Sequence, residues 1–257
     1  DRHYYQPGWT MVGAGIFAPE STGRDFQSLI PKGIACLKDS VAAFEPLQNR
    51  VVLESGKRIG YQRLIVAPGL KIDWQAVDGL QESLGRNGVT SNYSYQYAPY
   101  TWQLVQNLKE GRALFTQPPM PIKCAGAPQK AMYLSGDYWH KHKRLDAIDI
   151  QFHNAGGVLF GVKDYVPALQ KYVEKYQADL NFFSKLVSVD ADTKTATFES
   201  CKPDAEKVRQ TVEFEMLHVA PPQTAPDFIK QSDLADQAGW VDVDQFTLRH
   251  KSFDNIW

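Results

Sequence analysis

The chain has 257 residues, of which 43% are hydrophobic and 22% charged, and its formal net charge is -1. This length suffices for one large or two modest domains, and the composition supplies enough apolar residues for a packed core. The near-neutral charge argues against a nucleic-acid partner, because phosphate binding needs a surplus of basic residues. No apolar run approaches the roughly 18 residues of a membrane-spanning helix.

Residues 34–69 are expected to form short strands. Apolar residues alternate at Val41 and Ala43 and again at Val51 and Leu53, and a Ser-Gly pair supplies a turn after them. The segment "RLIVAPG" predicts a buried strand, and "IACLKDS" is strand-like, with Cys36 among apolar neighbours. We therefore expect Cys36 to lie in the core.

The end of this stretch is repeated later in the chain. "LVSVDADTKTATFES" has a hairpin pattern, and "VEFEMLHVAPP" then ends in an apolar strand before prolines. A constant offset of 153 residues carries Ile59 to Val212 and Pro68 to Pro221. A repeat at this distance indicates two copies of one domain type rather than a solenoid of short units.

Between the two copies the pattern alternates between strand and helix. "RALFTQP" and "AIDIQFHNAGG" predict strands, and "APQKAMYLSGDYWHKHK" and "KDYVPALQKYVEKYQ" predict helices. This order predicts an α/β fold with doubly wound parallel sheets of the nucleotide-binding type. The aromatic run "NYSYQYAPYTW" is interpreted as packing between domains, although a flat ligand is the alternative.

The chain lacks a dinucleotide fingerprint. Gly13, Gly15 and Ala18 fit G-x-G-x-x-A superficially, but Pro19 follows where a helix must begin, so we expect a loop rather than a phosphate cradle. The later strand "RALFTQP" is followed by "PPMPIKCAGAPQK" instead of a glycine loop. The next strand ends in "IQFHNAGG", without the acid that binds ribose. Both observations argue against NAD(P)H binding.

Cys124 occupies the place of the missing glycine loop. It lies just before a predicted helix, where the helix dipole favours an anion, and Lys123 and Lys130 add positive charge. These features favour a reactive thiolate; a small buried cysteine at a strand–helix junction is the alternative. Cys201 lies in a polar loop and is expected to be incidental.

No metal is expected, because the cysteines lack C-x-x-C spacing and the six histidines show no pairing at metal spacing. Three cysteines also argue against a disulfide scaffold and indicate a reducing compartment. His153 and His218 are expected as hydrogen-bonded residues of the core or its rim. The chain opens on "DRHYYQPGW" and stops at "FDNIW", and we interpret it as a piece of a longer protein.

The segments "HYYQPGWTMVGAG", "LIVAPGL" and above all "KCAGAPQK" resemble the sulfide:quinone oxidoreductases, most closely the mitochondrial type and its bacterial relatives. The resemblance implies a flavoprotein with two dinucleotide-binding folds joined by β-meander crossovers, the first domain incomplete here. It implies a partial FAD-binding domain at 1–92, a second Rossmann-like domain at 93–222 and a return segment at 223–257. Two cysteines near FAD would hold a sulfur-bridged disulfide, which sulfide attacks to leave a persulfide, and the electrons would pass to a quinone.

Within this resemblance Cys124 matches one catalytic cysteine, and the second would lie beyond Trp257. The flavin would be approached by the loop Tyr5-Gln6-Pro7 and by the strand end Ala67-Pro68-Gly69. The glycine fingerprint and a Gly-Asp motif would lie outside the chain, so we expect the isolated chain to bind FAD weakly and to be inactive alone. An NADH:quinone dehydrogenase-like flavoprotein and a non-catalytic remnant module are the alternatives.

The resemblance also implies partners. These are hydrogen sulfide, a quinone, a small sulfur acceptor such as sulfite, glutathione or cyanide, and a membrane surface reached through carboxyl-terminal elements that the chain lacks. The parent protein would be peripheral to the mitochondrial inner membrane or the bacterial cytoplasmic membrane, and the segment itself soluble. A homo-oligomer is compatible with these features.

Overall fold

A computed structural model describes residues 2–257, which form two compact units. The first unit comprises the described residues up to Leu29 together with Asp73–Pro222. The second comprises Ile30–Ile72 and Gln223–Trp257. The resemblance divides the chain by domain type, at 1–92, 93–222 and 223–257, whereas these two units are defined by their internal contacts. The expected domains therefore stay a prediction.

A parallel five-stranded sheet forms the centre of the first unit, in the order β10-β9-β8-β14-β7. Its strands are β7 (Val89–Thr90), β8 (Gly111–Gln117), β9 (Ile148–Asn154), β10 (Ala178–Phe182) and β14 (Met216–His218). β8 and β9 pair in parallel along their whole lengths. The predicted α/β fold class with a parallel sheet is therefore confirmed.

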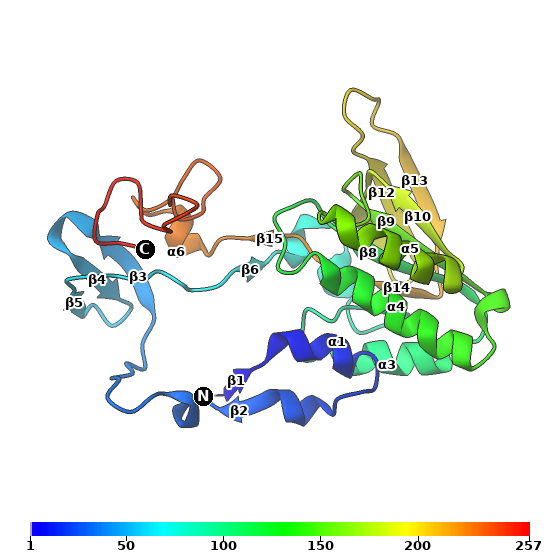
Figure 1. The fold of residues 1–257 in the computed structure, drawn as a ribbon, viewed down its shortest axis with the longest axis horizontal. Helices are drawn as coiled ribbons and strands as arrows, with labels where there is room; N and C mark the ends of the chain where they lie inside the picture. The colour runs from blue at the N-terminus through cyan, green and yellow to red at the C-terminus, as the bar shows by residue number, and fades with distance from the viewer. Residues whose placement is uncertain (1) are drawn as a thin grey trace. The chain divides into compact units, whose positions relative to one another are not determined.

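Three helices cover one face of this sheet: α3 (Ala98–Asn107), α4 (Gly126–Lys141) and α5 (Val166–Lys175) (Figure 1). Ala113 and Phe115 of β8 point to this face, because side chains two residues apart in a strand lie on one side. Met132 and Trp139 of α4 pack against them and are fully buried. Their burial at helical spacing explains why this segment forms a helix against the sheet.

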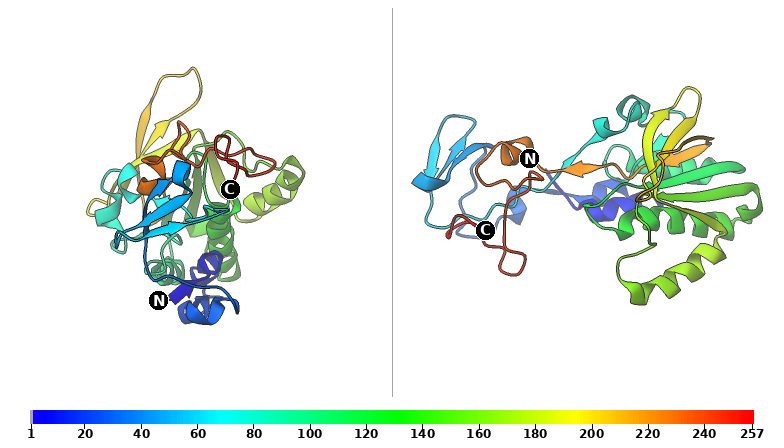
Figure 2. Two further views of the ribbon diagram at one scale, coloured as in Figure 1. Left: turned by 90° about the vertical axis from the view of Figure 1, so that its left-hand side faces the viewer. Right: turned by 90° about the horizontal axis from the view of Figure 1, so that it is seen from above.

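An antiparallel meander of β11 (Ser184–Asp190), β12 (Thr195–Ser200) and β13 (Arg209–Glu213) covers the other face. Leu114 of β8 and Leu217 of β14 point to this side and pack with Leu186 and Phe198 of the meander. Figure 2 shows the sheet between the helices and the meander. The first unit is thus a three-layer arrangement with a core on each face of the sheet.

The amino-terminal part of the first unit adds short elements. They are β1 (Arg2–Tyr4), which pairs antiparallel with β2 (Gly23–Asp25), the 3-10 helix η1 (Gln6–Gly8), α1 (Trp9–Val12) and, farther along the chain, α2 (Leu80–Ser83). Trp9 and Val12 pack with Ala98 of α3, and Tyr4 and Tyr95 pack around them. Tyr95 of the aromatic run therefore packs against the amino-terminal elements within this unit.

The second unit contains its own three-stranded antiparallel meander. Its elements are β3 (Val41–Glu45), β4 (Arg50–Leu53), β5 (Arg58–Gly60), the paired strands β6 (Lys71–Ile72) and β15 (Gln223–Thr224), and α6 (Asp227–Lys230). In register, Val51 pairs with Ile59 here, and Ala196 pairs with Val212 in the other meander. Each copy of the repeat thus contains the same kind of meander, and two copies of one domain type stay a prediction.

The prediction of a buried strand at "RLIVAPG" is wrong. Leu64 makes one isolated parallel bridge with Ile256, and Val66 donates its N–H to the carbonyl of Trp257. The segment is extended but open, and Ile65 is 78% exposed. An apolar run alone cannot tell whether a second layer covers it, and in the described residues only this short pairing reaches it.

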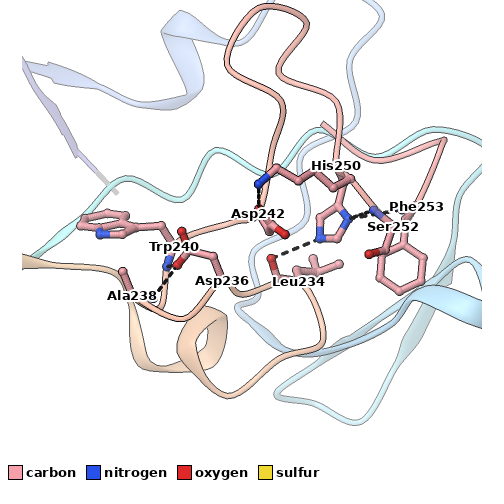
Figure 3. A network of polar contacts seen from close by, with 9 residues as sticks. Leu234, Asp236, Ala238, Trp240, Asp242, His250, Ser252 and Phe253 are labelled. Atoms are coloured by element: carbon pink, nitrogen blue, oxygen red, sulfur yellow. Dashed lines mark hydrogen bonds and ion pairs between the residues drawn. The ribbon is translucent and has the colours of Figure 1, made fainter.

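Residues 231–257 contain neither helix nor strand and are held by polar contacts (Figure 3). His250 is buried, and its Nδ1 accepts the backbone N–H groups of Ser252 and Phe253 at 3.0 and 3.2 Å. Its Nε2 therefore carries the proton and donates to the carbonyl of Leu234 at 3.2 Å. One imidazole thus joins two distant parts of this segment.

None of the helices found in residues 2–257 is both long and apolar enough to cross a membrane.

Candidate functional site

The site begins where β8 ends, at the carboxyl edge of the parallel sheet. Pro118 and Pro119 follow Gln117 directly, and Pro121 comes two residues later. Proline has no N–H to donate to a strand ladder, so the chain must leave the sheet here. The segment 118–125, which we call the Cys124 loop, then leads into α4.

Cys124 lies in this loop two residues before α4 begins, and its side chain is exposed. Its N–H donates to the carbonyl of Ile122 at 3.1 Å, and its own carbonyl accepts the N–H of Ala127 at 2.7 Å. Its φ is +90°, a conformation that residues with a Cβ rarely adopt. The alternative of a small buried cysteine is therefore wrong, because the thiol faces solvent at the helix amino end.

Lys123 is held at both ends. Its Nζ donates to Oε1 of Gln6 in η1, and its carbonyl accepts the hydroxyl of Tyr93 at 3.2 Å. Burial lowers the pKa of Lys123, and Cys124 partly opposes this effect by favouring the charged ammonium. The structure therefore brings Gln6 and Lys123 together beside Cys124. Lys130 lies on the exposed side of α4.

Tyr93 belongs to the connection between β7 and α3, which is tied to the carboxyl edge of the sheet. Ser91 Oγ donates to the carbonyl of Val219 at 2.6 Å and accepts the N–H of Tyr93 at 3.1 Å. The N–H of Asn92 donates to Nε2 of His218 at 3.1 Å. Sequence reasoning did not single out Tyr93, because its partner lies 30 residues away in the chain.

His218 and His153 are both buried and hydrogen-bonded, as expected. Desolvation lowers the pKa of His218 to about 4, so the ring is neutral and Nε2 accepts a bond from Asn92. His153 stacks on Phe198 at 3.7 Å between ring centroids, and its Nδ1 lies 2.8 Å from Ser184 Oγ. Both serve the core of the first unit.

The glycines of "VGAGIFA" are explained by close packing. A Cβ on Gly13 would lie 2.3 Å from Asn92 Oδ1, and one on Gly15 would lie 2.2 Å from the ring of Trp102. Gly15 also has φ +70°. Both residues therefore need to be glycine to let this turn approach α3 and the residues before it.

The other two cysteines differ from Cys124. Cys36 is exposed and lies outside any strand, so its expected place in the core is wrong. Its apolar neighbours Ile34 and Leu37 are exposed too, so apolar neighbours did not indicate burial here. Cys201 is half-buried, donates to the carbonyl of Ala155 at 3.1 Å, and has its pKa raised by burial. Across residues 2–257, no group of His, Cys, Asp or Glu is arranged to hold a metal ion.

The residues that the resemblance assigns to FAD divide between the two units. Tyr5, Gln6 and Pro7 lie in the first unit, where Tyr5 is 59% exposed and Gln6 accepts a hydrogen bond from Lys123. Ala67-Pro68-Gly69 lies in the second unit, exposed and extended. Gly69 has φ +80° and open space at its Cβ position, so a ligand can approach its backbone. The assignment of both segments to FAD stays a prediction.

No family model matches the chain. It is 44% identical over 259 residues to the mitochondrial sulfide:quinone oxidoreductase of Dictyostelium discoideum, with all of this chain and 56% of that protein covered. It is 43% identical over 257 residues to the mitochondrial sulfide:quinone oxidoreductase of Mus musculus, with 100% and 57% covered. The chain thus spans a little over half the length of the curated relatives that it matches.

A solved structure of the sulfide:quinone oxidoreductase from Aquifex aeolicus superimposes with a TM-score of 0.81. The sequence identity is 17%, and the match covers all of this chain and 59% of that one. At this identity the match shows the fold alone. The two curated relatives confirm the resemblance stated from the sequence, and this structure agrees with its fold.

Proposed function

We propose that this chain is part of a flavin-dependent sulfide:quinone oxidoreductase, in which Cys124 is a catalytic cysteine. The observation that carries the proposal is the Cys124 loop itself. It replaces the phosphate-binding loop at the carboxyl edge of the sheet and presents an exposed cysteine. The preceding residue, Lys123, donates to Gln6, which the resemblance assigns to the flavin. The similarity to enzymes of this name over the whole chain supports it.

The chemistry requires a sulfur electrophile and a sulfur nucleophile. Sulfide, as HS⁻, attacks a bridged cysteine disulfide, so that one S–S bond breaks and another forms. One cysteine then carries the persulfide, and the other leaves with the electron pair on the bridging sulfur that it keeps, as a persulfide anion. A bound FAD supplies the chemistry that takes up this pair and delivers it to a quinone, which gains two electrons and two protons.

The chain places positively charged groups near Cys124. Cys124 precedes α4, whose unpaired N–H groups favour negative charge, and Lys123 is close enough for its charge to interact with Cys124. Lys130 adds positive charge on the same helix. The persulfide sulfur is expected to pass to a small acceptor such as sulfite, glutathione or cyanide. The second cysteine is expected beyond Trp257.

The test is sulfide-dependent quinone reduction by the full-length protein and its Cys124→Ser variant. We expect the variant to lose the activity by at least about a hundredfold, because a serine hydroxyl cannot form the disulfide. Cys201→Ser is the matched control, since Cys201 is a half-buried thiol in the same unit. An unchanged rate of quinone reduction in Cys124→Ser would show that Cys124 takes no part in the reaction.

An NADH:quinone dehydrogenase-like flavoprotein is the competing function. It predicts that NADH bleaches the flavin of the full-length protein without sulfide, whereas our proposal predicts bleaching by sulfide and not by NADH.

For the isolated chain we expect weak FAD binding and no activity. Yellow flavin that co-purifies with it in stoichiometric amount would contradict this expectation.

A further inference from the structure

We propose that Tyr93 is a positioning residue for Cys124, which acts by fixing the peptide that precedes it. The inference rests on the proposed function, because it concerns the cysteine assigned to catalysis there. Its structural basis is a hydrogen bond of 3.2 Å from the Tyr93 hydroxyl to the carbonyl of Lys123. That carbonyl belongs to the same peptide group as the N–H of Cys124.

The segment that carries Tyr93 is firmly attached to the sheet. Thr90 pairs with His218 in the β7–β14 ladder, and Ser91 and Asn92 are buried. Ser91 Oγ bonds the carbonyl of Val219 and the N–H of Tyr93, and the Asn92 N–H bonds the neutral ring of His218. Because these contacts fix the backbone on both sides of Asn92, the backbone from which the Tyr93 side chain extends has a defined position.

The peptide that Tyr93 reaches needs such support. Cys124 has φ +90°, and a conformation of this kind persists only where surrounding contacts impose it. The neighbouring hydrogen bonds, Cys124 N–H to Ile122 and Ala127 N–H to Cys124, are local to the turn and move with it. The Tyr93 hydroxyl is a contact from a separate element that fixes the orientation of the Lys123–Cys124 peptide relative to the sheet.

Gln6 supplies a second point of attachment, through the Nζ of Lys123. Tyr93 thus holds the main chain of Lys123, and Gln6 holds the end of its side chain. The contact with Gln6 acts through the four flexible methylene groups of the Lys123 side chain, whereas the contact with Tyr93 acts on the backbone itself. For this reason we assign the orientation of Cys124 to Tyr93 rather than to Gln6.

The first experiment measures backbone hydrogen–deuterium exchange over residues 118–127 of the chain. Tyr93→Phe removes only the hydroxyl. Because one such hydrogen bond changes a local equilibrium by about twofold to tenfold, we expect exchange at Cys124 and Ala127 to accelerate by that factor. Tyr100→Phe is the matched control, since its hydroxyl accepts the N–H of Gly88 at 3.1 Å away from the Cys124 loop. Unchanged exchange in Tyr93→Phe would overturn the proposal.

The second experiment separates positioning from a general structural effect. In the full-length protein, Tyr93→Phe is expected to slow flavin reduction by sulfide about twofold to tenfold and to leave flavin reoxidation by quinone unchanged. Equal slowing of both half-reactions would overturn the proposal in favour of a structural role. If the unsubstituted protein shows no flavin reduction by sulfide, the proposed function fails, and the exchange measurement still decides whether Tyr93 fixes the Cys124 loop.

Discussion

Mild acid is expected to destabilise the first unit through its two buried histidines. Burial lowers the pKa of His218 to about 4. Burial also lowers that of His153 to about 4, and there the nearby Arg112 adds to the effect while Asp149 opposes it. In the unfolded chain each ring titrates near 6.5, so between pH 6.5 and 4 the unfolded state binds more protons. Stability is therefore full above pH 6.5 and falls as the pH drops towards 4.

The size of the effect follows from the shift. A shift from 6.5 to about 4, at about 1.4 kcal/mol per unit, corresponds to about 3 kcal/mol for each histidine over the whole window. By pH 5 the loss amounts to about 2 kcal/mol for each ring. A typical domain has a free energy of unfolding of about 5–15 kcal/mol, so this loss is easily measured.

The assay is urea unfolding at a series of pH values from 7.5 to 4.5, followed by tryptophan fluorescence. His218→Gln keeps an acceptor for the Asn92 N–H and removes the titrating ring. Between pH 7 and 5, the free energy of unfolding of this variant should therefore decrease by about 2 kcal/mol less than that of the wild type. His153→Gln is an independent second variant, and substitution of the exposed His140 controls for loss of a histidine as such. Parallel curves for wild type and both buried-histidine variants would refute the reasoning.

Two further substitutions test packing and the Figure 3 network. Gly15→Ala should lower the free energy of unfolding in urea by about 1–3 kcal/mol, because its Cβ would overlap the Trp102 ring. Gly33→Ala is the control: Gly33 lies in the second unit with φ +91° and open space at its Cβ position, so this substitution measures the backbone cost alone. Equal losses in the two variants would exclude the overlap. His250→Ala should cost about 2–3 kcal/mol and speed hydrogen exchange across residues 234–256, since it removes a buried ring and its three hydrogen bonds. Lys251→Ala, which breaks an exposed ion pair, should change stability by less than about 1 kcal/mol, and an equal effect of both substitutions would contradict the role of His250.

Strong local patterns made much of the fold predictable. The β8–α4–β9 unit follows from apolar strands and a helix whose buried positions recur at helical spacing, and the repeat predicted the second meander. "RLIVAPG" and Cys36 failed for one reason: both predictions inferred burial from apolar neighbours, and burial depends on whether another layer of the structure covers the segment.

The sequence indicated the cysteine of the candidate site but not the residues that contact its loop. Cys124 was identified by its position between a strand and a helix. The contacts to Lys123 come from Gln6, 117 residues away, and Tyr93, 30 residues away, and no local pattern signals such pairs. Likewise, the glycines at 13 and 15 are predicted to lie in a loop rather than a phosphate cradle, but their constraint by the side chains of Asn92 and Trp102 has no local signal.

The two similar meanders create a potential for strand exchange within one molecule. Side-chain pattern alone would let β13 align on β4 in place of β5, since Val212 and Ile59 occupy equivalent positions. The correct partner β5 is joined to β4 by residues 54–57, whereas β13 lies about 150 residues further on, and closing the longer connection costs about 3 kcal/mol more entropy. Short separation along the chain, more than the identity of the paired side chains, thus prevents strands of the two meanders from mispairing during folding.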